Sequence, residues 1–437
     1  MKVCKFGGSS LSCGEKFKKV KEIILKDKER KIIVVSAIGK KTNDEHKITD
    51  LLFLTYSHIR YHFDYMPILD EVKNRYLSIV KELNIDIDLD KEFSLIIEKI
   101  KNGITEEELV SYGEYLSAII MASYLNFRFI DARDIIKFNY EGHVDEEKTF
   151  QLMSNIEVSS GIVIPGFYGE YPNSNICLFS RGGSDVTGSF VARGFKADYY
   201  ENFTDVSGVY MANPSIIENP RKIDAISYSE LRELSYSGAN VLHEEAIIPL
   251  EDYPIPIIIL NTDFPEDKGT LIQKNVLDKT YLLTGIAGKK DFTSFTFIKK
   301  RSTDKLSVIL DVLNVFNRYH VPIEHIPTSI DSFSVVVEKS KMEKCYYDLI
   351  ADFKRINDIL DIKEDDDIAL VTVVGRNMIE KPGTSGRILS VFGNEKINIK
   401  LIAQGREEIN IIIGISNKDY EKSIKALYSH FAFESIK

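Results

Sequence analysis

Residues 3–10 read Val3-Cys4-Lys5-Phe6-Gly7-Gly8-Ser9-Ser10, and this segment guides the interpretation of the rest of the chain. A short apolar run with one lysine is typical of a buried strand, and the double glycine predicts a tight turn at its end. Because glycine carries no Cβ, the N–H groups of the turn can converge on an anion beside the lysine. The segment is therefore a candidate phosphate loop, although an ordinary turn with a surface lysine fits it equally well. It lacks the spacing of a Walker loop and the third glycine of a dinucleotide fingerprint.

Size and composition indicate a soluble globular protein with two or three domains. The chain has 437 residues, of which 44% are hydrophobic and 28% charged. Its net charge of −10 argues against nucleic acid as a partner, because phosphate backbones require basic faces. One local cationic pocket could still hold a nucleotide.

The four cysteines lie far apart and form no Cys-x-x-Cys pair, so we expect neither a disulfide framework nor a zinc site. No apolar run approaches the roughly 18 residues of a membrane span, and no targeting segment is recognised. We therefore expect a reduced protein in the cytoplasm, without a membrane partner.

Strand-like and helix-like segments alternate along the first 275 residues, which predicts an α/β layer fold with ligands at the carboxyl ends of parallel strands. We expect strands at 31–36, 161–166, 198–203 and 257–260, and helices at 106–125 and 184–193.

The last part of the chain repeats itself. Residues 313–316 align with 389–392 at an offset of 76 (389 − 313), and 321–326 and 334–337 align with 397–402 and 410–413 at the same offset. A constant offset over three segments indicates two α+β modules. We place the domains at 1–275, 276–362 and 363–437.

Four further segments carry polar groups suited to a ligand. Residues 36–43 place hydroxyls and lysines after a strand, which suits an anionic ligand and a solvated loop about equally. Residues 112–114 place Glu114 near the start of a long helix, where its carboxylate could hold an ammonium group but is more simply explained by the helix dipole. Residues 181–185, Arg-Gly-Gly-Ser-Asp, are the strongest local signal, because helix capping explains neither the arginine nor the two glycines. Residues 204–210 offer Thr204, Asp205 and Tyr210 around a glycine turn.

Taken together and in this order, these segments resemble the aspartate kinases of the amino acid kinase family. The likeness runs nearly end to end and includes Pro165-Gly166-Phe167 and the closing motif with Asn261-Thr262 and Gly269-Thr270. The resemblance implies a three-layer α/β/α kinase domain with a mainly parallel sheet. The 76-residue repeat resembles two ferredoxin-like ACT modules, one threaded into the other, so the boundary at 362 need not be a boundary in space.

The resemblance implies phosphorylation of the β-carboxylate of L-aspartate by ATP with Mg²⁺, the first step of lysine, threonine and methionine biosynthesis. Lys5 and Asp185 are implied to be catalytic, with Mg²⁺ carried by the nucleotide rather than by protein side chains. The ATP site is implied to comprise Lys5, Gly7, Gly8, Ser9, Thr204, Asp205 and Tyr210. The aspartate site is implied to comprise Thr42, Glu114, Arg181 and Ser184.

The ACT modules imply a homodimer or higher homo-oligomer that is inhibited by an amino acid, with lysine favoured over threonine. The candidate effector residues are Thr328, Ser329, Asp331 and Gln404.

Three positions depart from the family pattern. Asn240 stands where a lysine is usual, and Ser215 stands where an arginine is usual, so two basic contacts to the nucleotide are missing. Ser307 replaces the glycine found at Gly383 in the second module, which weakens the expectation of an effector at the first.

Two alternatives remain open. The chain could be another small-molecule kinase of this fold, acting on glutamate, acetylglutamate or a nucleotide. It could instead be a non-catalytic amino acid sensor, a reading that Asn240 and Ser215 favour.

Overall fold

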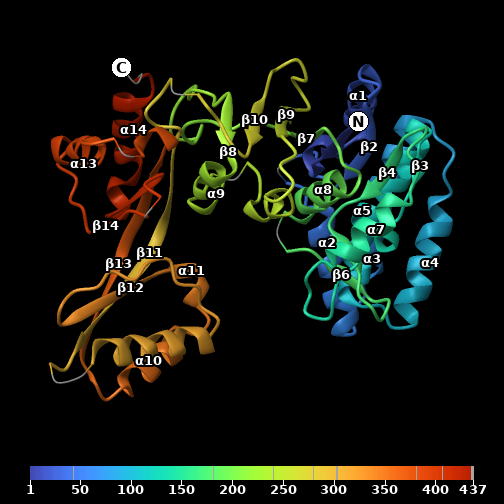
Figure 1. Ribbon diagram of the computed structural model, residues 1–437. Coiled ribbons are helices and arrows are strands. Elements are labelled where there is room, and N and C mark those ends of the chain that lie inside the picture. The colour runs from blue at the N-terminus through green and yellow to red at the C-terminus, as the bar shows by residue number, and fades with distance from the viewer. Residues whose placement is uncertain are drawn as a thin grey trace. The chain divides into compact units, whose positions relative to one another are not determined.

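The computed structural model describes residues 1–42, 44–180, 182–239, 241–278, 280–301, 304–379, 381–405 and 407–434. The chain divides into two compact units. The first comprises residues 1–209, 222–232 and 240–276, and the second comprises 210–221, 233–239 and 277–437. Figure 1 labels the main helices and strands of both units.

An eight-stranded sheet forms the centre of the first unit. Its order is β3-β4-β2-β1-β7-β9-β10-β8, and all neighbours are parallel except β9 and β10. The strands are β1 (Lys2–Phe6), β2 (Arg30–Val35), β3 (Arg128–Phe129), β4 (Ile162–Pro165), β7 (Tyr199–Thr204), β8 (Ala225–Ser227), β9 (Ile257–Asn261) and β10 (Thr270–Gln273). A separate hairpin pairs β5 (Tyr168–Glu170) with β6 (Ile176–Leu178).

Helices form two layers around this sheet. One core cluster joins the sheet to α1 (Gly14–Lys26), α2 (Ile48–Arg60), α3 (Met66–Leu83), α4 (Leu89–Lys101) and α5 (Glu106–Leu125). On the other face lie α6 (Ala132–Ile135), α7 (Glu146–Ser154) and α8 (Gly183–Gly194), of which α8 packs on β1 and β7. The expected three-layer α/β/α fold with a mainly parallel sheet is confirmed.

The alternation of side chains along β1 assigns each residue to a layer. Cys4 and Phe6 belong to the core under α1 to α5, so Lys5 points to the opposite face, where α8 lies. A single lysine is thereby directed out of an otherwise buried strand toward one helix.

Helix α5 coincides with the helix expected at 106–125. The Thr105 side chain accepts a hydrogen bond from the N–H of Glu108, and three glutamates in the first turn favour the positive end of the helix dipole. Asn126 ends the helix in the left-handed conformation. The expected strands at 31–36, 198–203 and 257–260 are β2, β7 and β9, and the helix at 184–193 is α8, all within one or two residues.

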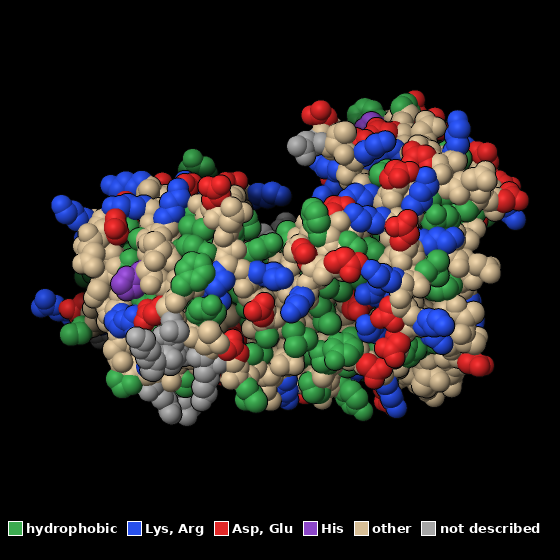
Figure 2. Space-filling model, turned by 90° about the horizontal axis from the view of Figure 1, so that it is seen from above, with side chains coloured by type: hydrophobic (Ala, Val, Ile, Leu, Met, Phe, Trp, Pro, Cys, Tyr) green, Lys and Arg blue, Asp and Glu red, His purple; other side chains and the backbone are tan. Residues whose placement is uncertain are grey.

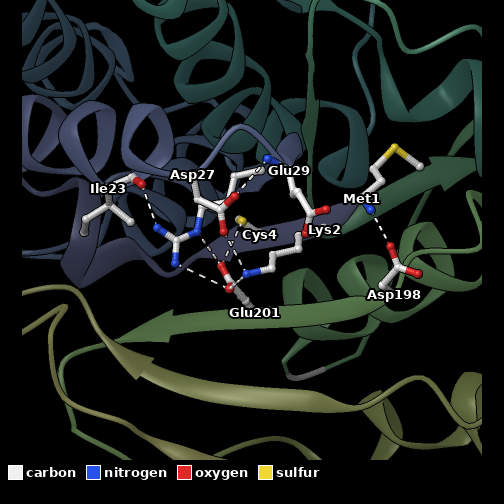
Figure 3. Close-up of polar contacts among 9 residues, drawn as sticks. Met1, Lys2, Cys4, Ile23, Asp27, Glu29, Asp198 and Glu201 are labelled. Carbon is white, nitrogen blue, oxygen red and sulfur yellow. Dashed lines mark hydrogen bonds and ion pairs between the residues drawn. The ribbon is translucent and has the colours of Figure 1, made fainter.

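A buried ionic cluster aligns β1, β2 and β7 at their amino ends (Figure 3). The Glu201 carboxylate, 3% exposed, accepts from Arg30 Nε at 2.7 Å and lies 3.1 Å from Lys2 Nζ, which also contacts Asp27 at 2.8 Å. Because Cys4 pairs with Glu201 in the ladder, the cluster reinforces the register that places Lys5 opposite Asn202.

The second unit contains a five-stranded antiparallel sheet of order β12-β11-β13-β15-β14. Its strands are β11 (Gly285–Lys299), β12 (Ser332–Glu338), β13 (Ile359–Val374), β14 (Leu401–Ala403) and β15 (Asn410–Ile415). Its helices are α10 (Lys305–Arg318), α11 (Lys339–Met342), α12 (Tyr346–Lys354), α13 (Thr384–Asn394) and α14 (Tyr420–Phe431), and α9 (Tyr228–Tyr236) has residues in both units.

The long strands β11 and β13 run through both repeats (Figure 1). Residues 285–289 pair with 370–374, and residues 292–299 pair with 359–368 beyond a bulge. One end of this ribbon joins a core with α13 and α14, and the other joins a core with α10 and α12. The first strand of the repeat region therefore contributes to both cores, as expected for threaded ACT modules.

The 76-residue offset corresponds to equivalent elements. The aligned segments at 313–316 and 389–392 lie in α10 and α13, and those at 334–337 and 410–413 lie in β12 and β15. The third pair, 321–326 and 397–402, leads into edge segments, of which the first bridges to β12 at His325 and the second forms β14.

The surface carries charges of both signs. On the face drawn in Figure 2, lysine and arginine side chains are interspersed with aspartate and glutamate. In the described parts of the chain, no helix combines the length and apolar character that crossing a membrane requires.

The ionic cluster leads to a stability prediction. Glu201→Ala should lower the free energy of unfolding of the first unit by about 3–5 kcal/mol, because Arg30 and Lys2 would lose their buried partner. Asp198→Ala, which removes an exposed partner of the Met1 amino group, should cost less than about 1 kcal/mol. Urea unfolding of both variants checks this, and equal effects would contradict it.

Candidate active site

A cavity of about 1090 Å³ opens at the carboxyl ends of β1 and β2, where parallel α/β sheets bind ligands. Its walls come from the loops that follow these strands and from the first turns of α2 and α8, with α5 beneath. The lining residues are Lys5, Gly8, Ser9, Ser36, Ala37, Ile38, Gly39, Lys40, Lys47, Thr49, Asp50, Phe53, Glu114, Phe167, Ser180, Gly182, Gly183, Ser184, Asp185 and Asp205.

Lys5 and Asp185 form an ion pair in this cavity. Lys5 Nζ lies 2.6 Å from Asp185 Oδ1, and both side chains are largely buried. A Cβ on Gly7 would lie 3.4 Å from Lys5 Nζ, so the ammonium group sits directly against the glycine turn. The pair places a positive charge beside the backbone of the turn.

The first and second loops pack backbone against backbone. The Gly39 N–H donates to the Gly8 carbonyl at 2.8 Å. A Cβ at Gly39 would lie 2.4 Å from Gly8 O, and one at Gly8 would lie 2.9 Å from Ala37 O, so neither position accommodates a side chain. The glycines thus allow two loops to share one wall of the cavity.

Arg75, on α3, holds the second loop from outside the cavity. Its guanidinium donates to the carbonyl oxygens of Gly39 and His46, each at 2.6 Å, and lies 3.3 Å from Glu45. Arg75 was not predicted as a site residue, because nothing in the local sequence of α3 shows which loop it contacts.

Glu114 is a buried acid of the cavity whose pKa is strongly raised. It is 3% exposed, and its Oε2 atom has no hydrogen-bond partner among the described residues. Burial raises its pKa to about 8, although a backbone hydrogen bond from Ala37 and the charge of Lys5 oppose this shift. A buried carboxyl with a free oxygen suits a cationic ligand group, which would favour the ionised form.

Helix α8 begins at the cavity wall. Gly182 is left-handed at φ 74°, and a Cβ there would lie 2.4 Å from the Cβ of His243. Ser184 and Asp185, in the first turn of α8, line the cavity. Arg181 lies outside the described residues, and so does Asn240.

The segment after β7 is supported by neighbouring strands. Thr204 Oγ1 donates to Asp205 Oδ1 at 3.1 Å, and Asn261 Nδ2 donates to Asp205 O at 3.3 Å. Gly208 lies so close to Thr270 that a Cβ would be 2.4 Å from its hydroxyl. Asp205 consequently projects into the cavity from a braced turn.

The structure brings together most of the predicted site. Lys5, Gly8, Ser9, Glu114, Ser184, Asp185 and Asp205 line one cavity, with Gly7 beside Lys5. Thr42 is exposed and does not line it, and Thr204 contributes through Asp205. Tyr210 belongs to the second unit.

Several lining residues were not predicted as site residues. Lys47, Thr49, Asp50 and Phe53 come from the start of α2, immediately after the second loop. A helix beginning at a strand-end loop was the signal that could have indicated them. Among the described residues, no group of three or more His, Cys, Asp or Glu side chains could hold a metal ion.

In the second unit, two of the predicted effector residues, Thr328 and Gln404, are separated by the 76-residue offset of the repeat. Gln404 lines a shallow groove with the segment 381–386, and Ser385 Oγ donates to its Oε1 at 3.4 Å. Thr328, Ser329 and Asp331 are exposed, and the Ser329 carbonyl accepts from Lys305 Nζ at 2.6 Å.

Comparison with known proteins identifies the family of this chain. Residues 1–261 match the model of the amino acid kinase family, and residues 371–431 match an ACT domain. The chain is 32% identical to aspartokinase 3 of Bacillus subtilis over 99% of its own length and 98% of that protein.

Solved structures show the same fold. Aspartate kinase of Clostridium acetobutylicum superposes with a TM-score of 0.93 at 43% identity, covering 99% of this chain and 100% of that one. Aspartokinase III of Escherichia coli, in complex with aspartate and ADP, superposes with a TM-score of 0.80 at 22% identity, covering 98% and 99%. The chain belongs to the amino acid kinase family and, within it, to the aspartate kinases.

Glu114 gives the protein a pH-dependent stability. Because its folded-state pKa of about 8 exceeds the ordinary value of 4.5, the folded state binds the extra proton between these values. Its contribution to the free energy of unfolding therefore falls as pH rises from about 4.5 to about 8. Glu114→Gln removes this slope, so the melting temperature of the variant relative to wild type should rise over that window.

The matched control is Glu108→Gln on the same helix, where the carboxylate is partly exposed and bound to Lys99. The difference in melting temperature between Glu108→Gln and wild type should not rise as pH increases from about 4.5 to about 8. A Glu114→Gln difference that is independent of pH would contradict the prediction.

Proposed function

We propose that this chain transfers the γ-phosphoryl group of ATP to the β-carboxylate of L-aspartate, giving 4-phospho-L-aspartate. The observation that carries the proposal is the Lys5–Asp185 pair set against the Gly7-Gly8 turn, with the unpartnered Glu114 carboxyl in the same cavity. The first group suits a phosphoryl anion and the second suits the ammonium of an amino acid. Membership of the aspartate kinases supports the assignment.

This reaction requires no general base. A free aspartate side chain has a pKa of about 3.9, so the nucleophile is already ionised near neutral pH. The barrier arises because an anion approaches a polyanion, and catalysis therefore depends on positioning and charge neutralisation.

Lys5 supplies the neutralising charge. It points from a buried strand to the glycine turn, in a partly desolvated site where a charge acts more strongly than in water. Gly7, Gly8 and Ser9 would donate N–H and hydroxyl groups to phosphate oxygens, while Asp185 orients the ammonium of Lys5.

The substrate aspartate would bind between α5 and α8. Glu114 would hold its ammonium group, and Ser184 would contact a carboxylate at the start of α8. Arg181 remains the proposed partner of the α-carboxylate. Thr49, which lines the cavity, is better placed than Thr42 for the hydroxyl contact.

The nucleotide would lie along the turn after β7, with Thr204, Asp205 and Tyr210 as its proposed contacts. ATP would enter with Mg²⁺, which neutralises phosphate oxygens and largely retains its water shell.

The ACT repeats would regulate this activity within the biosynthesis of the aspartate-derived amino acids. We propose a homodimer or higher homo-oligomer, with lysine as the favoured effector and threonine as the alternative. An effector must bind the inactive arrangement more tightly than the active one, since equal binding shifts nothing.

Substitution of Lys5 tests the catalytic assignment. In an assay of aspartate-dependent ADP release, Lys5→Ala should lower kcat by about 10²- to 10³-fold, as expected for a group that stabilises transition-state charge. Lys5→Arg should retain more activity because it keeps the charge. Lys18→Ala, which removes an exposed lysine paired with Glu15, is the matched control and should leave kcat unchanged.

Near wild-type turnover by Lys5→Ala would overturn the role of Lys5. A wild-type protein that binds lysine tightly but shows no turnover with any carboxylate substrate would instead support the amino acid sensor.

Lysine should inhibit the wild-type enzyme at millimolar concentration, as measured by the same assay with lysine and threonine, alone and together. Thr328 and Gln404 occupy equivalent positions of the two repeats, 76 residues apart (404 − 328), so Thr328→Ala and Gln404→Ala form a matched pair. The variant in which the inhibition constant rises identifies the repeat that binds the effector. Activity unchanged by either amino acid or by the mixture would refute the proposed regulation.

A further inference from the structure

Asn202 carries a buried amide and directly follows Glu201 in the same strand. It lies on β7 and is 2% exposed. The parallel ladder pairs it with Lys5 on β1, so both side chains point to the face covered by α8. A polar side chain at such a position requires a partner, and its partner is in the active site.

That partner is the carboxylate of Asp185. Asn202 Nδ2 donates to Asp185 Oδ1 at 2.8 Å, and the same oxygen lies 2.6 Å from Lys5 Nζ. The carboxylate is thus held between an ammonium group from β1 and an amide from β7. Unlike a second lysine, the amide keeps its hydrogen bond without competing for the charge of Asp185.

Tyr200, two residues before Asn202 on the same strand, also contacts Asp185. Its hydroxyl donates to the backbone carbonyl of Asp185 at 3.2 Å and lies 3.4 Å from Asn202 Nδ2. Burial raises the pKa of Tyr200 well above its ordinary value, so the hydroxyl keeps its proton and remains a donor. Gly188 makes room for it, because a Cβ there would lie 2.4 Å from the hydroxyl oxygen.

We propose that Asn202 is a positioning residue of the phosphoryl transfer, which fixes Asp185 so that its Oδ1 holds the Lys5 ammonium against the Gly7-Gly8 turn. Without the amide, the Asp185 side chain could rotate into the open cavity and take Lys5 with it. When a phosphoryl oxygen draws Lys5 away, the amide still satisfies the carboxylate, so Lys5 is released at lower cost. This inference rests on the proposed function.

Asn202→Leu is close in shape and removes only the amide. We expect kcat to fall about 10- to 100-fold, the size of effect associated with losing one hydrogen bond to a charged group. KM values for aspartate and ATP should stay within about twofold, because Asn202 touches neither substrate site and acts on the reacting charge alone. Tyr200→Phe, which removes only the hydroxyl, should fold readily and show a smaller fall in kcat.

The pH dependence of kcat in Asn202→Asp distinguishes positioning from a purely structural role, which would leave that dependence unchanged. The introduced carboxylate would face Asp185 on α8, Lys5 on β1 and Tyr200 on its own strand, with Glu114 of α5 acting on Lys5. Two adjacent carboxylates share a proton at lower pH, which restores a hydrogen bond at this position. The ratio of variant to wild-type kcat should therefore rise as pH falls, while the titration of Glu114 cancels in the ratio.

Wild-type turnover with aspartate is measured first, so that failure of the proposed function is seen separately. Given that turnover, three results would overturn the inference: a kcat for Asn202→Leu close to wild type, a loss confined to KM, or a ratio for Asn202→Asp that does not change with pH. A fall in kcat of Asn202→Leu that is accompanied by a large fall in its melting temperature would also overturn it, if Tyr200→Phe keeps wild-type kcat and the kcat ratio of Asn202→Asp to wild type does not change with pH.

Discussion

The ion pair between Lys5 and Asp185 is the interaction on which the rest of the active site depends. A lysine in the middle of a buried strand requires a partner, and the register of β1 against β7 places its ammonium group under the start of α8. The amino-end cluster around Glu201 reinforces this register from the opposite end of the same strands. The glycines of the two loops then allow backbone groups to approach the charge that the pair holds in place.

Glu114 differs from this ion pair, because one oxygen of its buried carboxyl has no hydrogen-bond partner among the described residues. The Lys5–Asp185 pair is compensated within the chain, whereas Oε2 of Glu114 has no partner among the described residues and its pKa is raised to about 8. One site therefore combines a positive charge held ready for an anion with an acid that gains from a cation. An amino acid nucleophile beside a phosphoryl group meets both requirements, which is why the local chemistry agrees with the family assignment.

Much of the fold followed from local patterns, since strand-end loops, helix caps and the 76-residue offset are short-range features. Helix α5 and strands β2, β7 and β9 lie where periodicity placed them, and seven of the residues that the family resemblance implied for the site line the cavity. The family resemblance implied that Thr42 contacts the substrate, but Thr42 is exposed, and residues at the start of α2 line the cavity instead. Arg75 and Asn202 were not predicted as site residues, because each forms its hydrogen bonds with a loop or helix that is distant in the sequence.

By itself, the sequence determined which residue types stand at the ends of which strands, and it made a lysine with two glycines a candidate for binding an anion and a helical glutamate a candidate for binding a cation. These depend on nearest-neighbour chemistry and need no long-range information. Only the tertiary structure decided which groups meet. It brings Asn202 to the Asp185 carboxylate that contacts Lys5, leaves Glu114 without a full set of partners, and threads β11 through both repeats. Such pairings are set by strand register and helix packing, which depend on the whole core rather than on any one segment.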